Sequence, residues 1–240
     1  MAPTILLTRA EDAAADFADS LRSRFGADLD IVVSPLMRID HVDGQPENLD
    51  GFASVIFTSR NGVRAFAART SRRDWPCYCV GDATAAAATR EGFRAVSANG
   101  AADDLAELLK RDQPRTPCLY VRGDHVASDL FKVLISAGIE TAEAVLYRQI
   151  AQELTASARA VLKRENPVIL PLFSPRSSRL FFEQDTGAAQ LLVAAISEQT
   201  AQAVPADRVY TLRVAQAPTA PAMLDAMQGL FDAAKRLEGG

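Results

Sequence analysis

Short apolar runs alternate with amphipathic segments along the whole chain. Apolar runs bounded by turn residues predict strands at residues 4–8, 31–33, 55–57, 78–80, 119–121, 168–173 and 191–196. Apolar positions spaced three and four apart predict helices at 13–25, 60–68, 83–91, 105–110, 128–137, 157–164, 175–183 and 223–234. Gly26, Gly92 and Gly138 end three of these helices. The alternation predicts an α/β protein with parallel sheets flanked by helices.

An internal repeat organises these elements. The matched pairs are 57–66 with 172–181, 80–84 with 196–200, 7–10 with 120–123, and Gly26 with Gly138. In the first pair Ser59 aligns with Ser174, and all four offsets lie between 112 and 116 residues. Because the matches keep one order, they indicate two similar α/β units, each about half of the chain.

Composition and charge narrow the class of protein. The chain has 240 residues, of which 48% are hydrophobic and 23% are charged, and its net charge is −4. This length and balance suit a globular protein of one large or two small domains, and no basic stripe suggests nucleic acid. No targeting segment is found near residue 1, and the apolar run at 191–196 is too short to span a bilayer. We therefore expect a cytoplasmic protein without nucleic-acid or membrane partners.

The cysteines and histidines do not form a recognisable reactive site. Cys77, Cys79 and Cys118 lack zinc-ligand spacing, and two of them open strand-like runs. We interpret them as buried thiols in a reducing compartment. His41 and His125 are the two histidines, and neither lies in a nucleophile–base arrangement. The sequence therefore favours neither a metal centre nor hydrolase chemistry.

The repeated motifs lie where strands end and helices begin. Ser59 and Ser174 are predicted N-caps, Pro175 suits the first helical position, and Asp82 and Ser197 are predicted to cap the second helix of each repeat. Backbone N–H groups at such turns bind anions. Two sets of helix N-termini facing one cleft would suit a large polyanion, whereas the simpler interpretation is that all of these are ordinary caps.

At these same residues the sequence resembles the uroporphyrinogen-III synthase family. The motifs that carry the resemblance are 55–63, 78–85, 119–124, 146–148, 173–175, 196–201 and 217–219. They span nearly the whole chain, and their order is more specific than any one motif. Pro171 departs from the family pattern and predicts a sheet edge or a bulge. The Ser-Glu-Gln turn before Thr200 also departs, and Pro205 predicts a short helix there.

The resemblance implies a topology of two similar α/β domains joined by a two-stranded connector. Domain 1 would comprise 1–35 plus 150–240, domain 2 would comprise 40–145, and the connector strands would be 36–39 and 146–149. The residues alone equally permit two tandem domains divided near Pro114.

The resemblance also implies an activity. The family cyclises hydroxymethylbilane, a linear tetrapyrrole with many carboxylates, to uroporphyrinogen III, with loss of water and inversion of the last pyrrole ring. No metal or cofactor is implied, and we expect a monomer. Tyr147 is the candidate catalytic residue, as a weak acid toward the departing hydroxyl; simple packing on the connector is the alternative. The candidate substrate-binding residues are Arg9, Thr58, Ser59, Asn61, Gly62, Gly81, Thr84, Arg122, Gly123, Ser174, Arg176, Ser177, Ser197 and Thr200.

Two other classes of function compete with this interpretation. A binding or regulatory protein of the same fold would recognise a tetrapyrrole without turnover. A two-domain binder of the periplasmic sugar-binding kind would also repeat an α/β unit, but we expect such a protein to carry a signal peptide, and none is found.

Overall fold

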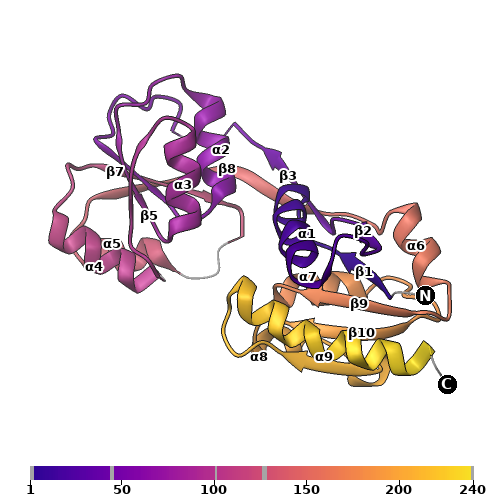
Figure 1. Cartoon of the computed structure of the whole chain (residues 1–240). Coiled ribbons are helices and arrows are strands. Elements are labelled where there is room, and N and C mark those ends of the chain that lie inside the picture. The colour runs from indigo at the N-terminus through magenta and orange to yellow at the C-terminus, as the bar shows by residue number, and fades with distance from the viewer. Residues whose placement is uncertain (1–2, 44–45, 101, 126–128, 239–240) are drawn as a thin grey trace. The chain divides into compact units, whose positions relative to one another are not determined.

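A computed structural model describes residues 3–43, 46–100, 102–125 and 129–238 (Figure 1). The chain divides into two compact units. Unit 1 comprises Met1–Arg38 and Ala151–Gly240, and unit 2 comprises Ile39–Ile150. The α/β prediction with parallel, helix-flanked sheets is confirmed, and each unit holds one such sheet.

The sheet of unit 1 is parallel throughout. Its strands are β1 (Thr4–Leu7), β2 (Ile31–Val33), β9 (Pro167–Leu172), β10 (Gln190–Ala195) and β11 (Thr211–Val214). Their order across the sheet is β11-β10-β9-β1-β2, and each neighbouring pair is parallel. The central strands are buried along their full length, which explains their continuous apolar sequences.

Helices cover both faces of the unit 1 sheet. The helices of the unit are α1 (Glu11–Phe25), α6 (Ala156–Leu162), α7 (Pro175–Phe182), α8 (Glu198–Ala201) and α9 (Ala220–Glu238). Alternate residues of β1 point to opposite faces: Ile5 packs in the cluster with α1 and α9, while Leu6 packs in the cluster with α6 and α7.

Unit 2 is built in the same way. Its strands are β3 (Met37–His41), β4 (Ser54–Phe57), β5 (Pro76–Cys79), β6 (Arg94–Ser97), β7 (Cys118–Gly123) and β8 (Thr141–Ala151). The order is β3-β8-β7-β4-β5-β6, with the pairs from β8 to β6 all parallel. The sequence pattern did not predict β6 or β11, which are short strands at the edges of the two sheets and are only partly buried. It did not predict β3 or β8 either, and strands in those regions were expected only from the family resemblance.

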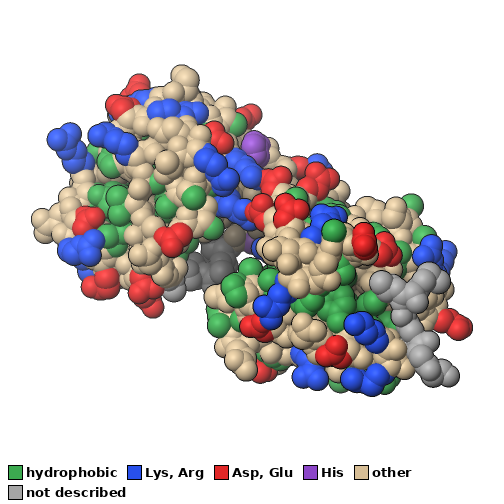
Figure 2. Space-filling view, viewed as in Figure 1, with side chains coloured by type: hydrophobic (Ala, Val, Ile, Leu, Met, Phe, Trp, Pro, Cys, Tyr) green, Lys and Arg blue, Asp and Glu red, His purple; other side chains and the backbone are tan. Residues whose placement is uncertain are grey.

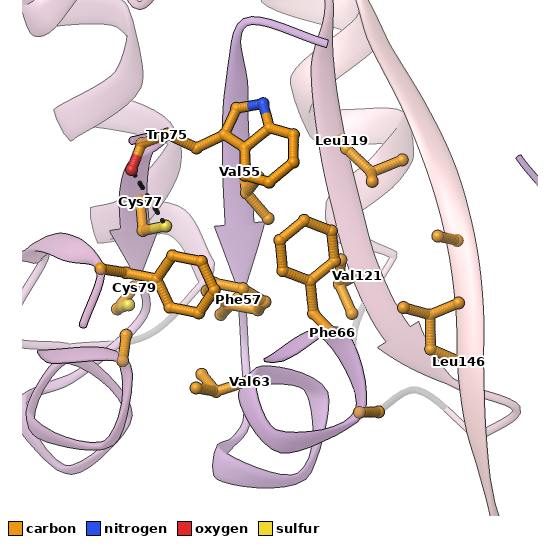
Figure 3. Close-up of a cluster of buried hydrophobic side chains, with 14 of the residues drawn as sticks. Val55, Phe57, Val63, Phe66, Trp75, Cys77, Cys79, Leu119, Val121 and Leu146 are labelled. Carbon is orange, nitrogen blue, oxygen red and sulfur yellow. Dashed lines mark hydrogen bonds between the residues drawn. The ribbon is translucent and has the colours of Figure 1, made fainter. Parts of the chain in front are cut away.

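Within the described residues of unit 2, four helices flank the sheet. They are α2 (Arg60–Arg69), α3 (Asp82–Arg90), α4 (Ala102–Asp112) and α5 (Leu130–Ser136). Figure 3 shows the core beneath α2 and α3, where Phe57, Phe66 and Trp75 pack edge to face, with ring centroids 5.3–5.7 Å apart. The opposite face packs against α4 and α5. The predicted start of α5 at Ser128 lies outside the described residues.

The strand order confirms the internal repeat. In sheet order, β11, β10, β9, β1 and β2 of unit 1 correspond to β6, β5, β4, β7 and β8 of unit 2. The sequence repeat matches β1 with β7, β9 with β4, and β10 with β5. Gly26 and Gly138 follow equivalent helices, and both have positive φ, at 110° and 76°.

Two local predictions were wrong. Pro171 lies inside β9, an interior strand, and pairs in regular register with Ala194. The C=O of Leu172 accepts a hydrogen bond from the N–H of Ile196, so the backbone of Leu172 points toward β10. The backbone nitrogen of the preceding Pro171 therefore points toward β1, and the pairing of β9 with β1 has already ended at Ile169. A residue without an N–H is tolerated there because the ladder has already stopped. The predicted Asp82 cap was also wrong, because Asp82 is the first residue of α3 and Gly81 is its N-cap.

Buried thiols were predicted and are confirmed. Cys77, Cys79 and Cys118 are free and fully buried. Burial raises the pKa of Cys118 to about 11 and that of Cys79 to about 12. All three thiols are therefore neutral packing groups near pH 7.

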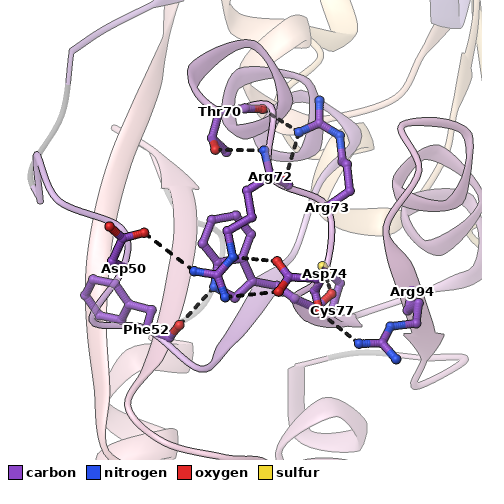
Figure 4. A network of polar contacts seen from close by, with 9 residues as sticks. Asp50, Phe52, Thr70, Arg72, Arg73, Asp74, Cys77 and Arg94 are labelled. Carbon is purple, nitrogen blue, oxygen red and sulfur yellow. Dashed lines mark hydrogen bonds and ion pairs between the residues drawn. The ribbon is translucent and has the colours of Figure 1, made fainter.

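The side chain of Arg73 hydrogen-bonds to the backbone of the loop between α2 and β5 (Figure 4). The Arg73 guanidinium donates to the C=O groups of Ala67, Thr70 and Arg72 around the end of α2, and to Glu91 C=O just after α3. Carbonyl groups at the end of a helix have no hydrogen-bond partner within it. The Arg73 guanidinium supplies donors for them, and its positive charge lies at the negative end of the helix dipole.

Candidate functional site at the carboxyl ends of the strands

The hydroxyl residues selected from the sequence lie where parallel strands end and helices begin. In unit 2, Thr58 and Ser59 follow β4 and Gly81 is close after β5. In unit 1, Ser174 and Ser197 hold equivalent places after β9 and β10. Ligands of open α/β sheets bind at this edge. Each unit therefore presents one candidate edge, built from the repeated motif.

Ser59 caps α2 and also contacts a tyrosine. Its Oγ accepts a hydrogen bond from the N–H of Gly62 at 3.0 Å, which confirms the predicted N-cap. The same oxygen lies 2.8 Å from Oη of Tyr147 on β8. Tyr147 is 4% exposed and packs in the core cluster with α2 and α3. The helix cap and the phenol thus share one hydroxyl.

Gly123, the last residue of β7, lies against the ring of Tyr147. A Cβ on Gly123 would be 2.6 Å from Cε2 and 3.1 Å from Oη of that tyrosine. The register between β7 and β8 shifts at this point, and Gly123 pairs with Tyr147. The next residue, Asp124, donates its N–H to the C=O of Tyr147 at 3.1 Å. The phenol therefore rests directly on the strand backbone.

The environment of Tyr147 keeps its phenol protonated. Burial raises the pKa of Tyr147, and the hydrogen bond to Ser59 opposes that shift. The Asp124 carboxylate raises the pKa further, whereas a hydrogen bond with the Gly123 backbone lowers it. A neutral phenol with a fixed hydroxyl partner can donate a proton but is a poor base at neutral pH.

Arg122 forms an ion pair with Glu143, a residue that the sequence pattern did not predict. Its Nε lies 2.6 Å from Oε1 of Glu143 on β8, and its NH1 donates to the C=O of Gly123 at 2.9 Å. The two side chains are 20% and 29% exposed. A ligand carboxylate would compete with Glu143 for this guanidinium.

A second tyrosine lies at the same edge, on the opposite face. Oη of Tyr120 on β7 lies 3.5 Å from Oγ1 of Thr58. Tyr120 is 3% exposed, and burial raises its pKa. Its apolar neighbours Leu119 and Val121 give it the pattern of a buried strand, which is why the sequence offered no functional signal for Tyr120.

The turn before α3 differs from its prediction. Gly81 is the N-cap, without a side-chain hydrogen bond, and Asp82 is the first helical residue. The extended backbone of Gly81 places its C=O to accept from the N–H of Thr84 at 3.0 Å. Thr84 is 6% exposed. A ligand at this turn would therefore contact backbone groups near Gly81 before the Thr84 side chain.

The turn before α7 in unit 1 matches that before α2. Ser174 Oγ accepts from the N–H of Ser177 at 3.0 Å, and Pro175 occupies the first turn of the helix, as predicted. Ser177 Oγ lies 2.8 Å from Ser174 Oγ, and Ser177 is 7% exposed. Arg176 is half-buried. The cap of α7 is thus paired with a serine hydroxyl, where the cap of α2 is paired with a phenol.

The turn before α8 is more enclosed. Ser197 Oγ accepts from the N–H of Thr200 at 3.3 Å and lies 3.1 Å from its Oγ1, and Thr200 is fully buried. The helix runs only over Glu198–Ala201, which confirms the short helix predicted from Pro205. Four residues carry little helix dipole, so this turn is a weaker anion site than α2 or α7.

Two further predicted residues, Arg9 and Gly62, have packing contacts. Arg9, after β1, stacks on Phe173 with its Cζ 3.9 Å from the ring centroid. A Cβ on Gly62 would lie 3.3 Å from the C=O of Val121, so this glycine lets α2 approach β7 closely. Asn61, beside it, is half-buried.

Comparison with known proteins places the chain in a family. Residues 17–225 match the family model described as uroporphyrinogen-III synthase HemD. The chain belongs to the uroporphyrinogen-III synthase family. No curated protein sequence matches it.

Two solved structures of uroporphyrinogen-III synthases share this fold. The structure from Helicobacter pylori 26695 has a TM-score of 0.66 and 18% identity, and the match covers 96% of this chain and 100% of that one. A mutant structure from Thermus thermophilus has a TM-score of 0.52 and 14% identity, with 98% and 100% covered. At such low sequence identity, the structural similarity shows that the fold is shared but does not identify site residues in this chain.

Within this uroporphyrinogen-III synthase family member, the predicted residues form two groups. In unit 2 the structure brings Ser59, Gly123 and Tyr147 into contact, with Thr58 and Arg122 on neighbouring positions. In unit 1 it brings Ser174 together with Ser177, and Ser197 together with Thr200. Basic and acidic side chains are interspersed on the visible face of both units (Figure 2).

A metal-binding cluster and a membrane-spanning helix are both absent from the part of the chain that the structure describes. Among those residues, no group of three or more His, Cys, Asp or Glu side chains could hold a metal ion. No helix within the described ranges is both long and apolar enough to cross a membrane.

Proposed function

We propose that this protein is a uroporphyrinogen-III synthase, which cyclises hydroxymethylbilane with inversion of the last pyrrole ring and loss of water. The observation that carries the proposal is the buried Tyr147 phenol, 2.8 Å from Ser59 at the carboxyl edge of the unit 2 sheet, in a chain of this family. We further propose the family topology, with connector strands at 36–39 and 146–149 and a monomer that needs no metal or cofactor.

In this proposal Tyr147 acts as a general acid. Its phenol donates a proton to the hydroxyl of the hydroxymethyl group, the C–O bond breaks and water leaves. The electrophilic azafulvene that remains is attacked by the last pyrrole ring through a spiro intermediate. A pyrrole carbon loses its proton as the rearranged macrocycle forms, and the phenolate regains one, so the residue is not consumed. The raised pKa of Tyr147 supports a donor role.

The rest of the proposal is conformational control. The substrate supplies its own reactivity, and its spontaneous closure gives the uninverted isomer, so the protein must hold one folded conformation. Helix N-termini at α2 and α7 offer backbone N–H groups, and Ser174 offers a hydroxyl, for side-chain carboxylates. We propose that the α8 turn contributes through Ser197, since Thr200 is buried.

The test is incubation of the purified protein with freshly made hydroxymethylbilane, followed by separation of the type I and type III isomers. The proposal expects an excess of type III over the spontaneous background. Unchanged type I formation, together with saturable binding of the bilane, would instead indicate a tetrapyrrole-binding protein without turnover.

A further inference from the structure

Two residues from different elements contact the Tyr147 side chain at its polar end. Gly123 lies against Cε2, Cζ and Oη, so that a Cβ there would be 2.6, 2.7 and 3.1 Å from those atoms. Ser59 Oγ lies 2.8 Å from Oη. The ring is thus bounded on one side by the backbone of β7 and at its tip by the cap of α2.

We infer that Gly123 and Ser59 are positioning residues that hold the Tyr147 phenol in one orientation, Gly123 by having no side chain and Ser59 by its hydroxyl. This inference rests on the proposed function of Tyr147. The inference gives Gly123 a role other than substrate contact. It also gives Ser59 a role that Ser174, the equivalent residue of the other repeat, does not have.

The need for glycine at position 123 is steric and comes from the tyrosine. Among the described glycines, those with positive φ are Gly26, Gly92, Gly138 and Gly187, and Gly123 is not one of them. Alanine would therefore fit the backbone conformation at 123. It would not fit the space, because contacts under 3.0 Å force an atom to move and the atoms in the way belong to the Tyr147 ring.

The Ser59 hydroxyl can set the direction of the phenol proton. Ser59 Oγ already accepts the N–H of Gly62, and it carries a single proton of its own. When Ser59 donates that proton to Oη, the phenol proton points away from Ser59 and is free for a departing hydroxyl. The buried position of Tyr147 limits other orientations of the ring.

A double-mutant cycle tests the role of Gly123. Gly123→Ala should lower the rate of type III formation toward that of Tyr147→Ala, a loss of about 10²-fold or less. In the Tyr147→Ala background the same substitution should cost little more, because the group that it displaces is absent. Gly51→Ala is the matched control in unit 2, since a Cβ there meets nothing within 4 Å. Fully additive losses would overturn the inference.

A second measurement does not depend on turnover. The chain has four tyrosines, so ¹³Cζ-labelled tyrosine gives a simple NMR spectrum in which Tyr147→Phe assigns one resonance. Gly123→Ala and Ser59→Ala should both shift the Tyr147 resonance and leave that of the exposed Tyr210 unchanged. Gly51→Ala should leave both unchanged. A Tyr147 resonance that is the same in wild type and Gly123→Ala would overturn the inference.

Ser59→Thr provides the rescue. Threonine keeps both the cap and the hydroxyl, so it should restore the Tyr147 resonance and most of the roughly tenfold activity lost in Ser59→Ala. A threonine variant as inactive as the alanine variant, with a wild-type resonance, would contradict a positioning role. If the wild-type protein forms no type III isomer, the proposed function fails, yet the NMR arms still decide whether these residues hold the phenol.

Discussion

The hydroxyl oxygens of Ser59 and Tyr147 lie 2.8 Å apart although 88 residues separate them in the sequence. The contact joins the N-terminus of α2 to β8, a strand two places away from β4 in the sheet. It turns an ordinary helix cap into a partner of the one residue proposed to transfer a proton. Substitutions at this contact, at its counterpart in unit 1 and at the α2–β5 loop have distinct expected effects.

Replacing Tyr147 with phenylalanine should slow type III formation by about 10²-fold, the lower end of general-acid effects, because a phenol is a weak acid. The ring and its buried area are kept, so the thermal midpoint should change little. Rates of both isomers are measured by chromatography of the oxidised porphyrins. Tyr210→Phe, at an exposed tyrosine, is the control. A Tyr147→Phe rate within about threefold of wild type would leave packing as the role of this residue.

The pH dependence of the rate should be set by a protonated phenol. Because burial raises the pKa of Tyr147 above the ordinary 10.0, the acid form persists throughout the neutral and mildly alkaline range. The midpoint of any activity loss from phenol ionisation should therefore lie above pH 10.0. Initial rates of type III formation from pH 7 upward, corrected for spontaneous type I closure, give the profile. If wild type gains phenolate absorbance below pH 9 and Tyr147→Phe does not, Tyr147 ionises too early and the burial argument is contradicted.

Ser59→Ala and Ser174→Ala form a matched pair. Each removes an N-cap that accepts a backbone N–H at 3.0 Å, so each should lower the free energy of unfolding by about 1 kcal/mol. Only Ser59 of the two is placed against Tyr147, so Ser59→Ala should lose about tenfold in rate, while Ser174→Ala should lose less. Urea denaturation and initial rates on the same preparations separate the two effects. Equal rate losses would show that the caps, and not the phenol contact, set activity.

Arg73→Ala should destabilise the protein by about 1–3 kcal/mol, because it leaves helix-end carbonyls without their charged donor. Arg73 also stacks on Phe93, with its Cζ 4.7 Å from the ring centroid. Urea denaturation measures the loss. Arg72→Ala breaks exposed ion pairs with Asp74 and Asp50 and the stacking of the guanidinium on Trp75. It should cost less, because these ion pairs are exposed and do not cap helix-end carbonyls. Equal losses for the two variants would count against the capping role of Arg73.

Much of the fold was predictable from local pattern. Continuous apolar runs such as 168–173 and 191–196 marked strands buried on both faces, and Ser59, Ser174 and Ser197 marked helix starts that the structure confirms. The pattern failed at β6 and β11, since edge strands are short and half-exposed. It also failed at Asp82, because a glycine carbonyl can begin a helix without a side-chain cap.

The candidate site could be predicted only in part. The residue type at a strand end selected Ser59, the repeat and the family resemblance selected Gly123, and the resemblance selected Tyr147, but no spacing in the sequence links the three. Glu143 and Tyr120 were missed because one occupies a partly exposed strand position and the other sits in an apolar run. Both became visible as partners of Arg122 and Thr58 once the strands were in register.

The sequence by itself determined the alternation of elements and most helix starts, because propensity, capping and apolar periodicity act between residues close in the chain. It also determined the duplication, because the same motifs recur in one order 112 to 116 residues apart. Tertiary structure decided which of those elements are neighbours. The shared sheet order of the two units places β7 between β4 and β8, and only that order lets Gly123 approach the ring of Tyr147 while Ser59 reaches its hydroxyl. Contacts between distant residues depend on strand register and the close approach of backbones, which local sequence does not encode.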